Sequence, residues 1–290
     1  MLKKFAIALL VSSFALNANA QDLKNNAKSK ITSNLNKSLS NTLGNIFPTA
    51  EVSLSSGKTQ KVKGNILVVK PLSDMNDKEN TTFTQGSIYF SDDNTETLNL
   101  GLGQRKLLDN ENLILGANLF YDHELSSDHQ RASFGVEAIT SVGTLRANQY
   151  YGLSGWRAVE GVQEKALDGH DIEVGWPLPY LPWTKAYYRT FEWKGASGTS
   201  DLQGDEMSLE ASLPFGLNVE VGKRSNDGTS EDREFVSLSW KCCYKSDQQT
   251  FGLSEKAFNL TSVADQRYQK VRRQNLIVKQ QNLSLTIIGF

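Results

Sequence analysis

Long apolar runs are nearly missing from this chain, as are cysteine, histidine and any excess of one charge. Its 290 residues include 2 cysteines and 3 histidines, and 31 basic residues stand against 32 acidic ones for a formal net charge of −1. Two cysteines exclude a disulfide-rich scaffold, and three histidines argue against a histidine-based metal enzyme. A near-neutral chain lacks the basic stripe of a nucleic-acid-binding protein. After residue 20 no apolar run reaches the about 18 residues that cross a bilayer as a helix, which excludes a helical membrane bundle but not a transmembrane barrel.

The first 20 residues have the three parts of a secretory signal peptide. Lys3 and Lys4 form a short positive region, residues 5–14 are apolar, and Ala18-Asn19-Ala20 is a small-x-small cleavage site. The apolar part is too short for an uncleaved membrane anchor. We therefore expect residues 1–20 to be removed and the mature protein to leave the cytoplasm.

A polar segment, residues 21–47, follows this signal. Its apolar residues are spaced four apart, which places them along one face of a helix. They are Ile31, Leu35, Leu39 and Leu43. We expect a periplasmic helix here, with a loosely ordered polar lead segment as the alternative.

From Thr49 the apolar period changes to two, which indicates β-strands with one apolar and one polar face. In one such segment Met207 and Leu209 alternate with Ser208 and Glu210. The pattern predicts twelve strands, an even number that leaves both ends of the barrel on the periplasmic side. They span residues 50–56, 60–70, 82–91, 96–105, 112–121, 130–139, 142–152, 169–177, 183–193, 205–213, 216–224 and 233–243.

Two architectures suit alternating strands, a soluble sandwich and a transmembrane barrel. The strands have about the nine to eleven residues that a tilted membrane strand needs. Long and short connections alternate after residue 121, although the long connection 71–81 falls on the short side. Aromatic residues gather at both strand ends, as in the belts of lipid-facing strands. The sequence therefore predicts an all-β fold, a twelve-stranded antiparallel transmembrane barrel over residues 48–245.

The polar strand faces predict a wet lumen whose charges pair with one another and line a pore. The residues expected to face this lumen are Arg131, Glu137, Arg146, Glu173, Glu206, Glu210, Glu220 and Lys241. The residues expected in extracellular loops are Asp122, His123, His129, Trp156 and Arg157.

Signals for chemistry are weak. The loop with Asp122 and His123 has the residue types of a cation site, but a solvated loop braced by hydrogen bonds is the stronger interpretation, so we expect no metal. Gly101-x-Gly103 lacks the third glycine of a dinucleotide loop, so no cofactor is expected. No histidine lies in a nucleophile motif; we expect no enzyme, and an outer-membrane protease or lipase is the alternative. A strained disulfide between Cys242 and Cys243 is a further alternative in an oxidising compartment.

Longer motifs stand within and between the expected strands. They cover residues 98–105 (LNLGLGQR), 115–124 (LGANLFYDHE), 150–157 (YYGLSGWR) and 167–171 (LDGHD). Together they resemble the barrel domain of the inverse autotransporters, the family of intimin and invasin, over residues 48–245. The resemblance implies a twelve-stranded outer-membrane barrel, a linker that runs back up the pore, and a C-terminal passenger of Ig-like domains outside.

The tail, residues 246–290, also resembles this linker, and we expect it in or below the pore. Ser254 suits the N-cap of a helix over residues 254–273, and residues 273–278 (RQNLIV) resemble the linker's helix end and following strand. The fold expected is thus the barrel with a short N-terminal helix and a C-terminal linker that is part helical and part extended.

The chain stops at Phe290 without a passenger, so we expect a passenger-less translocator rather than an adhesin. Either the passenger was lost, or a separately encoded secreted protein uses the barrel. The alternatives are a simple outer-membrane pore or a structural envelope protein. The partners expected are outer-membrane lipids and the barrel-assembly machinery, and no nucleic acid.

Overall fold

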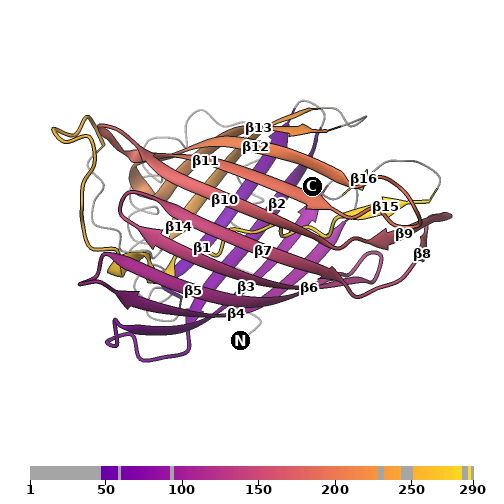
Figure 1. Cartoon of the computed structure of the whole chain (residues 1–290), viewed down its shortest axis with the longest axis horizontal. Coiled ribbons are helices and arrows are strands. Elements are labelled where there is room, and N and C mark those ends of the chain that lie inside the picture. The colour runs from indigo at the N-terminus through magenta and orange to yellow at the C-terminus, as the bar shows by residue number, and fades with distance from the viewer. Residues whose placement is uncertain are drawn as a thin grey trace, which may run out of the picture. The chain divides into compact units, whose positions relative to one another are not determined.

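A closed antiparallel barrel of twelve strands forms most of the structure, which is a computed structural model (Figure 1). It describes residues 47–57, 60–91, 95–227, 232–242, 251–282 and 287–288. The barrel strands are β1 (Thr49–Gly57), β2 (Gln60–Pro71), β3 (Asn80–Ser91), β4 (Glu96–Leu108), β5 (Leu113–Glu124), β6 (His129–Thr140), β7 (Thr144–Gly152), β10 (Gly169–Leu178), β11 (Leu181–Trp193), β12 (Leu202–Ser212), β13 (Leu217–Asn226) and β14 (Arg233–Cys242). Each strand pairs with the next barrel strand in the sequence, and β1 pairs with β14 to close the ring, so no barrel edge is left open.

A second sheet of four short strands is separate from the barrel sheet and lies at the right-hand end of the barrel in Figure 1. It combines a hairpin from the connection between β7 and β10 with two strands from the tail. Its strands are β8 (Arg157–Val159), β9 (Val162–Ala166), β15 (Lys279–Gln281) and β16 (Ile287–Ile288). We call this side of the barrel the loop end. The opposite side, the turn end, carries the tight connections 109–112, 141–143 and 179–180 and the 3-10 turn η1 (Pro214–Gly216).

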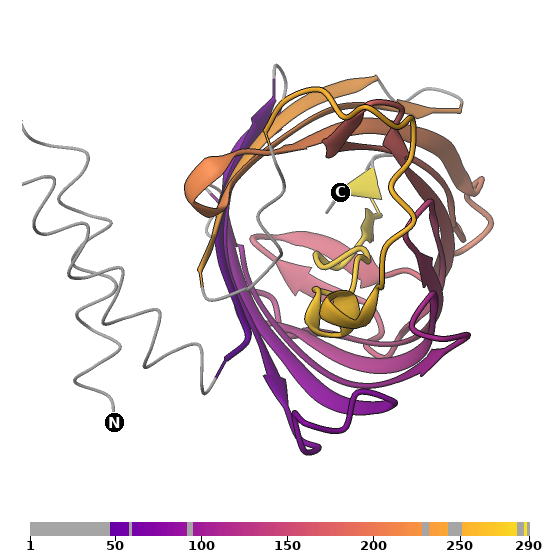
Figure 2. The same ribbon diagram turned by 90° about the vertical axis from the view of Figure 1, so that its left-hand side faces the viewer.

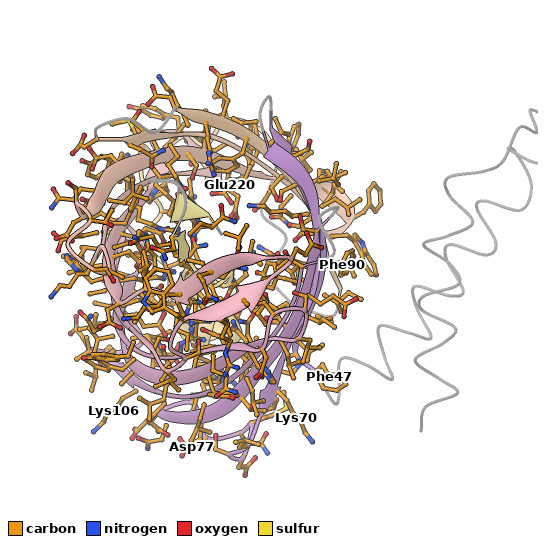
Figure 3. The ribbon with its side chains drawn as sticks, turned by 90° about the vertical axis from the view of Figure 1, so that its right-hand side faces the viewer. Phe47, Lys70, Asp77, Phe90, Lys106 and Glu220 are labelled. Carbon is orange, nitrogen blue, oxygen red and sulfur yellow. The ribbon has the colours of Figure 1, made fainter. Side chains whose placement is uncertain are left out.

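The inward and outward faces of the strands differ in polarity, as alternation predicts. Leu100, Leu119 and Met207 point outward and are 59%, 61% and 63% exposed, whereas Arg131 points inward and is 0% exposed. Figure 3, seen from the loop end, shows the outward Phe90 and Lys106 and the inward Glu220. An exposed apolar band of this extent is the face that lipid covers in a membrane barrel.

The twelve strands predicted from the sequence are all confirmed, and no strand bound moves by more than three residues. The hairpin β8–β9 was not predicted, because strands of three and five residues are too short to show a period. Among the described residues no helix is long and apolar enough to cross a membrane.

The helix predicted over residues 254–273 is wrong. Only the 3-10 turn η2 (Ala264–Tyr268) forms within it. The physical reason is that distant segments satisfy this backbone: Tyr180 N–H donates to the Ala257 carbonyl at 3.0 Å, and Ser254 N–H donates to the Tyr180 carbonyl at 2.9 Å. A segment whose polar groups are already paired gains little from helical hydrogen bonds.

Some expectations fall on residues that the structure does not describe. The signal peptide, residues 1–20, and the helix expected in residues 21–47 are two of them, since the described residues begin at Phe47. The third is the disulfide between Cys242 and Cys243, because Cys243 lies outside the described residues.

Replacing Leu209 by arginine tests the outward face. Leu209 points outward from β12, and Ser208 next to it points inward. Because a charge near the bilayer midplane is costly, we expect Leu209→Arg to destabilise the folded barrel by about 2–4 kcal/mol, measured by urea unfolding in vesicles. Ser208→Arg is the matched control and should cost clearly less. Gly222 is unsuitable as a control, since a side chain there would meet the Phe235 ring at 2.5 Å. Equal costs at positions 208 and 209 would contradict this assignment of faces.

Candidate functional site

The tail crosses the lumen of the barrel from the turn end to the loop end. At the turn end Val263 N–H donates to the Glu111 carbonyl at 2.8 Å, and at the loop end Leu167 N–H donates to the Val278 carbonyl at 3.0 Å. Figure 2 looks into the barrel from the turn end and shows this gold segment inside the ring of strands. Residues 263–278, here called the lumen segment, therefore lie inside the barrel.

Two wall arginines bind the backbone of the lumen segment. Arg105 donates through Nη1 to the carbonyls of Arg267 (2.8 Å) and Gln269 (2.7 Å). Arg131 donates to the carbonyls of Leu276 (3.0 Å) and Gln274 (2.7 Å). An extended chain inside a lumen has no neighbouring strand for its carbonyls, and buried carbonyls need partners. Wall arginines fill this need.

Wall carboxylates hold these two arginines in place. Glu137 Oε1 accepts from Arg105 Nε at 2.7 Å, and Asp122 Oδ2 accepts from Arg131 Nε at 2.9 Å. All four side chains are buried. Because an unpaired buried charge is costly, each guanidinium is aimed at the lumen segment by its own carboxylate.

The lumen segment in turn contributes arginines to wall carboxylates. Arg273 makes a bidentate pair with Asp122, at 2.9 Å to Oδ1 and 2.7 Å to Oδ2. Arg272 contacts three glutamates: Glu173 Oε1 at 3.0 Å, Glu220 Oε1 at 2.9 Å and Glu210 Oε2 at 3.3 Å. Ion pairs thus run from the tail to strands β5, β10, β12 and β13, so the lumen segment is fixed on several sides.

Aromatic rings give these arginines flat surfaces. The Arg272 guanidinium lies 3.8 Å from the centre of the Tyr187 ring, and the Arg273 guanidinium lies 4.4 Å from the centre of the Phe120 ring. Arg131 stacks over Tyr150 at 4.7 Å. Such cation–π contacts stabilise a guanidinium that has lost its water.

At the loop end, Lys279 joins the tail to the barrel and to the hairpin β8–β9. Its Nζ lies 2.5 Å from Glu124 Oε1 and 2.9 Å from Glu164 Oε2. Burial lowers the pKa of Lys279, but the two carboxylates outweigh burial and hold it above 10.5. Burial raises the pKa of Glu164, but hydrogen bonds from Gln281 and Lys279 bring it below 4.5. We call this contact, together with the pairing of β15 and β9, the latch.

At the turn end, Glu111 receives the tail as it enters. Ser262 Oγ donates to Glu111 Oε2 at 2.6 Å, and Lys78 Nζ lies 3.3 Å from Glu111 Oε1. These two hydrogen bonds lower the pKa of Glu111. The tail is therefore bound at both ends of the barrel as well as inside it.

The eight residues predicted to face the lumen all lie on inward positions of their strands and take part in charge pairs. Arg146 lies 3.2 Å from Glu173 and 3.7 Å from Glu137, and Lys241 lies 3.8 Å from Glu210. The full set is Arg131, Glu137, Arg146, Glu173, Glu206, Glu210, Glu220 and Lys241.

The prediction that Asp122 and His129 lie in an extracellular loop is wrong. Strand β5 runs on to Glu124 and β6 begins at His129, so the loop between them has only four residues. Asp122 instead lies at the centre of the lumen network, and His129 is buried with Nδ1 2.9 Å from Ser154 Oγ. Strand propensity was underestimated here because Asp122 and His123 are typical loop residues.

The loop prediction is also wrong for His123, which lies within β5 on its outward side, with Nε2 2.9 Å from Asp128 Oδ1. The two remaining predicted loop residues, Trp156 and Arg157, lie at the loop end. Arg157 begins β8 and lies 2.9 Å from Asp128 Oδ2. Trp156 packs against a buried cluster that includes Tyr150 and Trp193.

Sequence reasoning missed the tail's own contribution. No pairing with the lumen wall was predicted for the basic residues of the tail, because a helical pattern does not say which side chains meet that wall. These residues are Lys270, Arg272, Arg273 and Lys279. Arg105 stood on a polar face but was not singled out. Among the described residues, no group of three or more histidine, cysteine, aspartate or glutamate side chains is placed to hold a metal ion.

Comparison with known proteins gives a consistent set of similarities. The family model "Inverse autotransporter, beta-domain" matches residues 6–275. A protein of Escherichia coli K12 described as a putative attaching and effacing protein homolog is 33% identical over 184 residues, 59% of this chain and 61% of its own. Intimin of Escherichia coli O127:H6 is 29% identical over 258 residues, 83% of this chain and 26% of its own. The chain thus spans less than two thirds of the length of either relative.

A solved structure, "Unveiling the Mechanism Behind the in-meso Crystallization of Membrane Proteins", shares the fold. Its TM-score is 0.70 at 23% identity, and the match covers 81% of this chain and 99% of the solved one.

Removing Arg273 should loosen the lumen segment. Arg273→Met removes the two hydrogen bonds to Asp122 but leaves that carboxylate paired with Arg131, so we expect a loss of about 1.5–3 kcal/mol in the free energy that holds the segment in place. The measurement is the urea dependence of protease cleavage within residues 263–278. Arg273→Lys should recover part of the loss, since lysine keeps the charge but not the bidentate geometry.

Lys223→Met is the control for this change, because it removes an exposed ion pair with Asp232 that involves no residue of the tail, and it should leave cleavage unchanged. If Arg273→Met is no more sensitive than Lys223→Met, the Arg273–Asp122 pair does not hold the tail.

Acid should open the latch. The pKa of Glu164 is lower in the folded protein than its ordinary 4.5, so its pairing stabilises the latch above that pH and the contribution is lost as the pH falls further. A spin label at Asn282→Cys, with Cys242 and Cys243 replaced by serine, should be immobile at neutral pH and gain mobility below about pH 4.5. In Glu164→Gln the label should already be more mobile at neutral pH and change less with acid. The same acid response in both chains would assign it to another group.

Proposed function

The chain belongs to the inverse autotransporter β-domain family, and we propose that its barrel is a translocator whose export path is the route now taken by the tail. Family membership places the barrel in the outer membrane. The family is of the intimin type and is not known for enzymatic activity.

One observation carries the proposal: a polypeptide of this chain crosses the whole lumen in a mostly extended form. It enters beside Glu111 at the turn end and leaves beside Leu167 at the loop end. An extended chain is the form in which a polypeptide fits a lumen of this size, because a folded domain does not fit beside the inward side chains.

The wall contacts suit a moving chain. Arg105 and Arg131 bind carbonyl oxygens, which every polypeptide carries at regular spacing. A segment that slides by one or two residues presents new carbonyls to the same guanidinium groups. These contacts therefore support passage of many sequences, while the pairs of Arg272 and Arg273 support one final position.

Two sources of exported polypeptide suit this route. One is a segment joined to the tail beyond residue 290, and the other is a separately encoded secreted protein that uses the barrel without an attached passenger. Outer-membrane lipids and the barrel-assembly machinery complete the proposed partners. The second candidate function is a plugged pore or structural envelope protein, which the same dense lumen network favours.

A reporter placed after Phe290 separates these functions. If the tail marks an export path, the reporter should be labelled by antibody on intact cells, because the tail leaves the lumen at the loop end. The control places the same reporter directly after Tyr244. Strand β14 ends at the turn end, so this reporter should be labelled only in permeabilised cells. Labelling of both fusions only after permeabilisation would contradict the translocator and favour the structural role.

A further inference from the structure

The tail fills the lumen unevenly. It lies against large inward side chains on one side, where Phe120, Tyr150 and Arg131 contact it. On the opposite side, the middle of the junction of β1 and β14 has four small inward residues, with the larger Glu51 and Lys241 toward the turn end and Phe235 toward the loop end. The small residues are Ser53, Ser55, Ser237 and Ser239.

The four serines form one patch. Ser53 pairs with Ser239 and Ser55 pairs with Ser237 in the register of β1 and β14. Opposite residues in a sheet lie about 5 Å apart, so the patch is a shallow wall without side chains long enough to reach the tail. Space remains between this wall and the lumen segment.

Two cavities occupy that space. One has a volume of about 220 Å³ and reaches toward the loop end, where Lys63, Arg224 and Phe235 line it. The other has a volume of about 160 Å³ and reaches toward the turn end, where Glu51, Asn218 and Ser239 line it. They share five lining residues: Ser55, Tyr89, Glu220, Ser237 and Lys270. The two cavities thus adjoin in the middle of the barrel and extend toward its opposite ends, and we call them together the passage.

The passage is polar enough to hold water. A polar cavity needs about 10–15 Å³ of such volume to hold a single water, and both parts are well above that minimum. Its charges are mixed along the axis. Glu51 and Glu210 line only the part toward the turn end, and Glu220 and Lys270 line both parts. The part toward the loop end is richer in positive charge, with Lys63, Arg189 and Arg224 beside Glu206.

We propose that this passage conducts water and small inorganic ions across the barrel while the tail stays in place. The tail closes the lumen to large solutes but not to ions, because both cavities lie beside it: Lys270 crosses to Glu51 on β1 and lines the two cavities without filling either. Ion conduction here does not depend on export, so the proposal stands apart from the translocator function.

The test is conductance of the full chain in a planar bilayer with potassium chloride. We expect small, steady steps, and we expect Ser237→Trp to reduce them roughly tenfold, because pore conduction falls steeply as the diameter narrows. Ser237 lines both cavities, so an indole there fills the passage at its middle. Leu238→Trp is the matched control: Leu238 is the next residue of β14, points outward and is 47% exposed, and its replacement should leave conductance unchanged.

A second variant, on another strand, keeps the test valid if Ser237→Trp does not fold. Ser55→Trp fills the passage from β1 and should reduce the steps as Ser237→Trp does; heat-modifiable migration on gels shows that each variant is folded. Large steps that appear only in Arg272→Ala would mean that current needs the tail to leave, and would overturn the proposal. So would a silent full chain, or folded Ser237→Trp and Ser55→Trp variants that conduct as well as the unchanged chain. Surface labelling of the Phe290 reporter is independent of all these results.

Discussion

The pairing of Asp122 with two arginines is the interaction on which the rest of the lumen depends. Arg131 comes from the wall and Arg273 from the tail, and all three side chains are 0–4% exposed. The wall pair of Asp122 and Arg131 is neutral by itself. Arg273 adds a second positive charge, which is stable when buried because Asp122 holds it through two hydrogen bonds. Arg131 then reaches the carbonyls of Gln274 and Leu276, and Tyr150, which hydrogen bonds Asp171, accepts from Gln274 N–H.

These wall contacts account for the extended form of the tail. A helix would satisfy its own carbonyls and leave Arg105 and Arg131 without these acceptors. An extended chain offers its carbonyls to the wall and still places Arg272 and Arg273 on opposite sides, toward β10, β12 and β13 and toward β5. The lumen is thus a binding site for extended polypeptide, with backbone contacts that any sequence makes and side-chain contacts that stop one sequence at one position.

The barrel could be predicted from the sequence because apolar residues that face lipid alternate with polar residues that face the lumen along each strand. Leu98, Leu100 and Leu102 face outward, and Thr97, Asn99 and Arg105 face inward. The tail could not be predicted in the same way. Its residues after Ser254 are good helix formers, and the force that keeps them extended comes from wall side chains more than a hundred residues away in the sequence, such as Arg105. Asp122 was misplaced for a related reason, since only the closed ring brings it to Arg273.

The central claim is that the tail occupies the lumen as a bound segment, and single-channel conductance tests it most directly. The full chain is compared with a chain that ends at Tyr244, which keeps all twelve barrel strands. If residues 263–278 fill the lumen, the shortened barrel should open to steps many times larger than those of the full chain and should pass solutes that the full chain excludes. Equal conductance from the two chains would mean that the tail lies outside the pore, and would contradict the account.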